Sequence, residues 1–308
     1  MLRDFIFWLS TKKSVTDAIA RRGMRHGFAR RFVAGESLEQ TIPIAAALCA
    51  AGRRVILNQL GENVASAGEA RGARDSYIRA LHALDAAALD ANISIKPTQL
   101  GLDQDRELCI SLTGEIAATA KSLGRGIEID MEGSAYTEET IAIYESVQRR
   151  HGNAGMAMQS YLRRSLQDLK RLAPVRPKIR LVKGAYRESP AIAFQKKKDV
   201  DANFRLLLDA LLQLSASGGA LAAIGTHDPV LIAHAQERIR QLGLTGERYE
   251  FQMIYGIRRD LQEQLVSAGH PLRIYLPFGT AWVPYFMRRL SERPANLWFV
   301  LRSLVAER

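Results

Sequence analysis

The chain has 308 residues, of which 47% are hydrophobic and 24% charged, ordinary proportions for a soluble globular protein. Its 43 basic and 32 acidic residues give a formal net charge of +11, which could attract nucleic acid, anionic lipid or acidic small molecules. Its two cysteines, Cys49 and Cys109, exclude a disulfide framework, and no window approaches the apolar length of a membrane span, so a cytoplasmic protein is predicted.

Residues 1–50 are predicted to form a helical arm, and residues 51–308 the domain that follows it. An apolar stripe at helical spacing runs from Leu2 to Leu9, and a further helix is expected from about Leu38 to Ala50. We expect this arm to extend the larger domain rather than to enclose a core of its own.

After residue 50, strand-like apolar runs alternate with helical patterns. Eight runs are expected to be strands, at 53–60, 93–100, 126–132, 155–161, 178–185, 222–227, 249–255 and 273–279. Helical patterns separate them, at 65–89, 108–123, 138–149, 161–172, 200–214, 229–242 and 258–268. Eight strands, each followed by a helix, are typical of a (βα)₈ TIM barrel, an α/β fold.

Active sites of such barrels lie at the carboxyl ends of the strands, so polar residues there are site candidates. Almost every predicted strand supplies one, which is more than a purely structural barrel needs, because each buried polar group must find a partner. The candidates are Glu62, Lys96, Asp130, Glu132, Gln159, Arg180, Lys183, Thr226, His227, Gln252, Tyr255 and Tyr275. Asp130 and Glu132 are expected on one strand and on the same side of it.

The segment Lys178–Tyr186 is the most unusual of these runs, because a short apolar strand carries Arg180 within it and Lys183 at its end. Gly184 and Ala185 follow and allow a close approach of the backbone. One interpretation is that the two cations face a bound anionic cofactor or substrate; the other is an edge strand whose charges point to water. A closed barrel has no edges, which favours the first.

The last helical pattern follows Gly279 and places Tyr285, Arg288 and Arg289 on one face, with Glu292 one turn further on. Two adjacent arginines can bind a carboxylate in bidentate fashion. A surface helix with an Arg–Glu pair explains the same spacing, and the pattern alone leaves both open. No glycine-rich nucleotide motif and no metal-ligand spacing is present.

Several of these short motifs, in this order, resemble those of the proline dehydrogenase family. The resemblance covers strands two to eight and the final helix, and no aldehyde dehydrogenase region follows, as in the short monofunctional form. The motifs are Ile95–Gly101, Glu128–Glu132, Ile179–Tyr186, Thr226–His227, Tyr249–Gln252, Arg273–Pro277 and Tyr285–Glu292. Asn58 departs from the pattern, since the family often has Asp there, and so does Phe278.

The resemblance implies a distorted barrel that binds FAD, with L-proline between the flavin ring and the last helix. Asp130 and Arg180 would form the catalytic pair, with Arg180 near flavin N5. The implied substrate contacts are Lys96, Arg288 and Arg289 for the carboxylate and Tyr275 and Tyr285 for the ring. The implied cofactor contacts are Met131, Gln159, Arg180, Lys183, Gly184, Ala185, Thr226 and His227.

The implied reaction is oxidation of L-proline to Δ1-pyrroline-5-carboxylate by hydride transfer to FAD, the first step of proline degradation to glutamate. A membrane quinone would accept the electrons. The apolar stripe of the first helix and Leu297–Leu301 are candidate contacts for a peripheral association with the inner membrane, but core-packing faces explain both patterns better. Two alternatives remain at this stage. One is a barrel aldolase with Lys96 or Lys183 as a Schiff base; the other is a non-catalytic polyanion-binding protein, based on the net charge.

Overall fold

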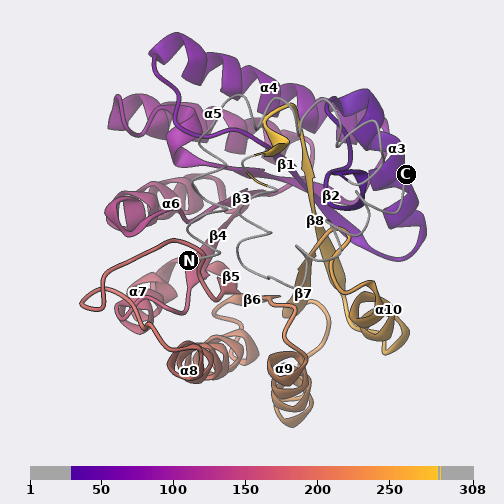
Figure 1. Ribbon diagram of the computed structural model, residues 1–308, viewed down its shortest axis with the longest axis vertical. Coiled ribbons are helices and arrows are strands. Elements are labelled where there is room, and N and C mark those ends of the chain that lie inside the picture. Colours follow the sequence, from indigo (N-terminus) through magenta and orange to yellow (C-terminus); the bar gives the residue numbers. More distant parts are fainter. Residues whose placement is uncertain (1–28, 284, 286–308) are drawn as a thin grey trace, which may run out of the picture.

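The computed structural model describes residues 29–283 and 285. Its eight parallel strands pair in sequence order, and β1 also pairs with β8, so the sheet closes into a barrel (Figure 1). The predicted α/β barrel is confirmed. The strands are β1 (Arg54–Gln59), β2 (Ala91–Ile95), β3 (Ile127–Ile129), β4 (Ala154–Gln159), β5 (Lys178–Val182), β6 (Leu221–Gly225), β7 (Tyr249–Ile254) and β8 (Leu272–Phe278).

Helices surround the strands on the outside (Figure 1). Their apolar residues recur every three or four positions; α8, for example, buries Phe204, Leu207, Leu208 and Leu211 on one face. The helices are α3 (Leu38–Ala50), α4 (Ala67–Ala86), α5 (Arg106–Ser122), α6 (Thr137–His151), α7 (Ser165–Leu172), α8 (Lys197–Ala216), α9 (Pro229–Gln241) and α10 (Arg259–Ser267). Among the described residues, no helix is both long and apolar enough to cross a membrane.

Part of the predicted helical arm packs directly on the barrel. Helix α3 contacts β1 and β8, and Ala45 belongs to the main hydrophobic core. Residues 33–35 have no regular secondary structure, and the Ala34 N–H donates to the Pro277 carbonyl oxygen at 2.9 Å. The predicted stripe from Leu2 to Leu9 lies outside the described residues.

Two predicted strands end earlier than expected, and both ends matter for the site. Strand β2 stops at Ile95, and a 3₁₀ helix spans Pro97–Leu100, because Pro97 has no N–H for the ladder and fits a first helical turn. Strand β3 stops at Ile129. The prediction that Asp130 and Glu132 share one side of a strand is therefore wrong.

The amino-terminal end of the barrel encloses a second set of buried charges. Glu128 of β3 pairs with Lys178 of β5 at 2.5 Å, and Arg273 of β8 pairs with Glu250 of β7 at 3.1 Å. Both carboxylates are almost fully buried. Gly155 makes room for Glu128, because a Cβ at Gly155 would lie 2.5 Å from a Glu128 carboxylate oxygen. Two cations balance two anions here, so the barrel floor is closed by a neutral network.

Acid should weaken this network through Glu250. Burial raises the pKa of Glu250, but the charges of Arg273 and Lys178 outweigh it and lower the pKa from its ordinary 4.5 to about 2. A depressed pKa gives stability that is complete above pH 4.5 and is lost as the pH falls toward 2, roughly 3 kcal/mol in all. Chemical denaturation at pH 6, 4 and 2.5 should show this loss in the wild type. Glu250→Gln should show a flatter profile, whereas Glu247→Gln, on the exposed surface, should keep the wild-type slope.

Candidate active site

A cavity of about 740 Å³ opens at the carboxyl ends of the strands, where barrel active sites lie. Of the polar candidates at the strand ends, Glu132 and Tyr255 do not line it. The catalytic, substrate and cofactor contacts implied by the resemblance all line it where they fall within the described part of the chain, and they come from six of the eight strands or the segments that follow them. These residues are Lys96, Asp130, Met131, Gln159, Arg180, Lys183, Gly184, Ala185, Thr226, His227, Tyr275 and Tyr285. Arg288 and Arg289 lie outside the described residues.

Asp130 is the centre of the inner part of the cavity. Its Oδ2 accepts hydrogen bonds from Lys96 Nζ at 2.9 Å and from the Tyr275 hydroxyl at 2.6 Å. Its Oδ1 accepts from Ser94 Oγ at 2.8 Å and forms an ion pair with Arg180. One carboxylate thus connects β2, β5 and β8 to the end of β3, and its acceptor sites are filled by protein donors.

These contacts fix the charges of the cluster. Burial raises the pKa of Asp130, but Lys96, Arg180 and the Tyr275 hydroxyl together lower it well below its usual range. Burial lowers the pKa of Lys96, but the charge of Asp130 raises it well above its usual value. At neutral pH the carboxylate is ionised and the amine is protonated. A protonated Lys96 is a poor nucleophile, which argues against the Schiff-base alternative at this residue.

Several buried polar atoms at the cavity wall have no hydrogen-bond partner within the described part of the chain. Three of them are Arg180 Nη1, a donor, and Gln159 Oε1 and Gln252 Oε1, both acceptors. The Arg180 guanidinium also lies over the Tyr275 ring, 5.0 Å from its centroid. Because buried polar groups are normally paired, the cavity wall fits a polar ring system that offers both donors and acceptors, as a flavin does.

Lys183 is not a free cation at the strand end. Its Nζ pairs with Asp201 at 2.5 Å and with Asp228 at 2.8 Å, and Lys197 pairs with both carboxylates as well. Burial raises the pKa of Asp228, but the hydrogen bond and charge of Lys183 lower it to about 2. This four-residue group is neutral and joins the end of β5 to the starts of α8 and α9.

Asp201 and Asp228 were not predicted as cavity residues, although each carries a recognisable local signal. Asp228 precedes Pro229 and caps α9, where its Oδ1 accepts from the Val230 N–H at 3.1 Å. Asp201 lies four residues after Lys197 on α8, a spacing that allows an ion pair. Local spacing could not show that both carboxylates pair with Lys183.

His227 is held by the backbone of the neighbouring strand. Its Nε2 accepts a hydrogen bond from the Ile254 N–H at 2.9 Å, so a neutral ring carries its proton on Nδ1. The imidazole lines the cavity in this fixed orientation. One ring nitrogen of His227 therefore has a structural role, and the other carries a hydrogen-bond donor.

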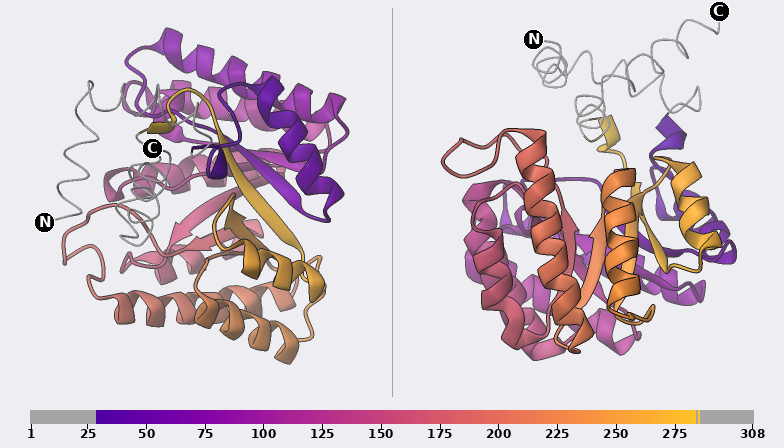
Figure 2. Two further views of the ribbon diagram at one scale, coloured as in Figure 1. Left: turned by 45° about the vertical axis from the view of Figure 1, so that its right-hand side comes forward. Right: turned by 90° about the horizontal axis from the view of Figure 1, so that it is seen from below.

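The long connection between β5 and α8 forms the outer wall of the cavity and projects from this end of the barrel (Figure 2). Glu188 in this loop accepts from the Ser134 N–H at 2.7 Å and from its hydroxyl. Further along, Arg163 lies over the ring of Phe194, 4.5 Å from its centroid. Glu188 therefore bonds the loop to the segment before α6. Ser134 and Glu188 are 54 positions apart, so no local pattern predicts this contact.

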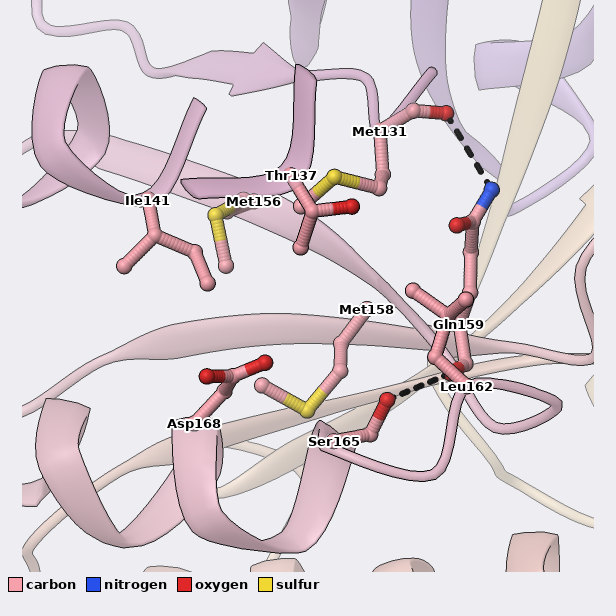
Figure 3. Close-up of a pocket in the computed structure, with 9 residues that line it drawn as sticks. All are labelled: Met131, Thr137, Ile141, Met156, Met158, Gln159, Leu162, Ser165 and Asp168. Atoms are coloured by element: carbon pink, nitrogen blue, oxygen red, sulfur yellow. Dashed lines mark hydrogen bonds between the residues drawn. The ribbon is translucent and has the colours of Figure 1, made fainter. Parts of the chain in front are cut away.

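A second, small cavity of about 10 Å³ lies behind the wall, between β3, β4, α6 and α7 (Figure 3). Three methionines line it, Met131, Met156 and Met158, and its volume suffices for about one water molecule. Beside it Gln159 is fixed at both ends: its backbone oxygen accepts from Ser165 Oγ at 2.6 Å, and its amide nitrogen lies 3.5 Å from the Met131 carbonyl oxygen. The packing behind the wall thus sets the direction of the Gln159 side chain.

Gly184 is required by both conformation and space. Its φ is +108°, and a Cβ there would lie 2.2 Å from the Tyr161 ring. We expect Gly184→Ala to cost about 1–3 kcal/mol of unfolding free energy, because the ring or the strand end must move. Gly152→Ala is the matched control, since Gly152 also has a positive φ, +72°, but nothing lies within 4 Å of the added Cβ. Equal losses in denaturant unfolding would contradict the role of the Tyr161 contact.

Within residues 29–283 and 285, no group of three or more His, Cys, Asp or Glu side chains could hold a metal ion.

The family model described as proline dehydrogenase matches residues 42–302. "Proline dehydrogenase 1" of Bacillus subtilis strain 168 is 36% identical over 305 residues, which is 99% of each chain. "Proline dehydrogenase" of Deinococcus radiodurans is 37% identical over 294 residues, covering 94% of this chain and 93% of that protein.

Solved structures share the fold. Proline utilization A from Bdellovibrio bacteriovorus, inactivated by N-propargylglycine, superposes with a TM-score of 0.80 at 23% identity. The match covers 88% of this chain and 33% of that one, so the chain spans about a third of the length of the solved protein. Proline utilization A from Bradyrhizobium japonicum gives a TM-score of 0.76 at 23% identity, over 92% of this chain and 32% of that one.

Proposed function

The chain belongs to the proline dehydrogenase family, and we propose that it binds FAD and oxidises L-proline to Δ1-pyrroline-5-carboxylate, the first step of proline degradation to glutamate. The observation that carries this proposal is the buried Lys96–Asp130–Arg180–Tyr275 cluster at the bottom of a cavity large enough for both a flavin ring and a small amino acid.

The cavity wall fits FAD through its unpartnered donor and acceptors, at Arg180, Gln159 and Gln252. When bound, FAD would supply the hydride acceptor, its N5, for a hydride from the ring carbon next to the proline nitrogen. We assign its binding to Met131, Gln159, Arg180, Lys183, Gly184, Ala185, Thr226 and His227, all of which line the cavity. A fixed positive charge at Arg180 favours the reduced, more negative ring.

The substrate carboxylate is assigned to Lys96 together with Arg288 and Arg289. Lys96 Nζ has three N–H groups, of which Asn58 Oδ1 and Asp130 Oδ2 accept two within residues 29–283, so one remains there for a ligand. Tyr275 and Tyr285 line the cavity and shape the space for a five-membered ring. Three cations on one carboxylate would fix which carbon of proline is presented for oxidation.

Asp130 holds this machinery in place and is not assigned as a base. Its four donors and its strongly lowered pKa leave it no tendency to take a proton from substrate. It keeps Lys96 and Arg180 charged and correctly oriented. Asp130 and Arg180 are therefore the catalytic pair, with the carboxylate acting through the two cations that it binds.

The test is turnover of L-proline by the purified protein with an artificial electron acceptor, with the product trapped by o-aminobenzaldehyde. Arg288→Met and Arg289→Met should each raise KM for proline by roughly 100-fold, since losing a charge-assisted pair costs about 2–5 kcal/mol. Arg240→Met, on the exposed face of α9, should leave KM unchanged. An unaltered KM in both of the first two variants would remove the carboxylate assignment.

A membrane quinone is the proposed electron acceptor, with the protein in the cytoplasm and in peripheral contact with the inner membrane. The segments predicted to make that contact lie outside the described residues. A short-chain quinone should therefore support turnover, and the protein should float with vesicles of anionic lipid. Failure of both assays in an enzyme active with the artificial acceptor would reject this part of the proposal.

A further inference from the structure

Asn58 occupies the end of β1 and faces the buried cluster. Its side chain is almost fully buried, and its Oδ1 accepts a hydrogen bond from Lys96 Nζ at 2.9 Å. Lys96 thus has two protein acceptors at the same distance, one neutral and one charged, Asp130. The same position could accommodate a carboxylate of nearly the same shape, which would satisfy Lys96 equally well.

The identity of residue 58 therefore sets the charge of the cluster. Lys96 and Arg180 each carry +1 and Asp130 carries −1, while Asn58, Ser94 and Tyr275 are neutral, so the directly bonded group has a net charge of +1. With Asp at position 58 the sum would be zero.

Among the residues that the structure describes, the nearest other carboxylates do not cancel this charge within the cluster. Glu132 turns away from the cavity and accepts from the Thr98 N–H at 3.0 Å and from its hydroxyl at 2.6 Å. Burial raises the pKa of Glu132, although the hydrogen bonds from Thr98 and the charge of Lys96 act in the opposite direction. Glu62 lies at the half-exposed rim, where water screens it. The Lys183, Lys197, Asp201 and Asp228 group is neutral as a whole.

An uncompensated buried cation favours a ligand with one negative charge. The third N–H of Lys96 is available to such a ligand, whereas Arg180 Nη1 is assigned to the flavin and Arg180 contributes its charge. The same charge repels a cation in the cavity. Proline in water is mostly a zwitterion with a ring ammonium, and its anion has the carboxylate and a neutral amine.

We propose that the neutral side chain of Asn58 gives this cluster its net positive charge and thereby makes the pocket select proline as its anion, with the ring amine neutral. The inference rests on the proposed function. Hydride loss from the carbon next to nitrogen needs the nitrogen lone pair, which an ammonium lacks. The amine proton passes to water before the anion binds, so no side chain of the cluster has to accept it.

The test compares two five-membered ring compounds, each of which carries only one of the two charged groups of proline. Cyclopentanecarboxylate carries the negative charge without the nitrogen, and pyrrolidine is a cation at neutral pH without the carboxylate. Their affinities for the oxidised, FAD-bound enzyme are measured by calorimetry at neutral pH for the wild type, Asn58→Asp and Asn58→Ser. Serine is neutral and keeps a hydrogen-bond acceptor near Lys96. Asn58→Ser therefore shows the effect of changing the side chain without changing its charge.

Asn58→Asp should weaken the binding of cyclopentanecarboxylate by roughly 10- to 100-fold and strengthen the binding of pyrrolidine, because the substitution adds one buried negative charge close to the ligand. Asn58→Ser should keep both affinities within about threefold of the wild type. Equal weakening of the carboxylate probe by both variants, or no weakening by Asn58→Asp, would overturn the inference. If the charge-dependent pattern appears in a protein that does not oxidise proline, the anion selection stands and the proposed function fails.

Discussion

Asp130→Asn should lower kcat/KM for proline by roughly 100- to 1000-fold and destabilise the fold by about 3–5 kcal/mol, the cost of breaking a buried ion pair. The substitution preserves shape, but the amide nitrogen would face donors, because Oδ1 and Oδ2 each accept two hydrogen bonds. Lys96 and Arg180 would remain buried without their counter-charge. Steady-state kinetics and denaturant unfolding measure the two effects.

Glu132→Gln is the matched control for this prediction. Glu132 is also buried and lies only two residues from Asp130, but its carboxylate bonds to Thr98 and is not part of the cavity wall. We expect it to change stability while kcat/KM stays within about threefold, since neutral Gln keeps one acceptor for Thr98. Wild-type kcat/KM in Asp130→Asn would contradict the assignment of Asp130.

Lys178→Met should destabilise the fold by about 3–5 kcal/mol without altering the cavity. Glu128 is 0% exposed, and Lys178 is its ion-pair partner at 2.5 Å, so removal of Lys178 leaves a buried carboxylate without that cation. The network lies at the amino-terminal end of the barrel, opposite the cavity. KM for proline in the folded variant should therefore equal that of the wild type.

The double variant Lys178→Met with Glu128→Gln distinguishes lost pairing from lost packing. Removing both charges also removes the uncompensated carboxylate, so we expect it to recover most of the stability lost in Lys178→Met. Urea unfolding of the two single variants and the double variant gives the coupling free energy. A double variant whose loss equals the sum of the two single losses would show that the ion pair contributes nothing.

The sequence was sufficient to predict the barrel, because apolar runs at strand and helix spacing alternate eight times and few folds accommodate that order. The sequence was less informative about where each strand ends, because single residues determine those boundaries. Pro97 ends β2 and starts a 3₁₀ helix, and β3 has only three residues, so Asp130 and Glu132 diverge. Apolar periodicity does not register such effects.

The sequence predicted which residues lie near one another at the site, but it did not predict which of them bond to one another. Knowing that barrel strands converge at one end placed Lys96, Asp130, Arg180 and Tyr275 near one another. The sequence could not show that a single carboxylate accepts from all of them, nor that Lys183 meets two carboxylates, because those contacts join distant segments. The buried Glu128–Lys178 pair was missed for the same reason.

The proposed function is tested most directly by an anaerobic titration of the purified protein with L-proline, followed in the visible spectrum. The protein should be yellow, and one equivalent of proline should bleach the flavin band, with one Δ1-pyrroline-5-carboxylate formed per flavin reduced. A colourless protein that does not take up FAD, or a flavin band that proline leaves unchanged, would contradict the proposal.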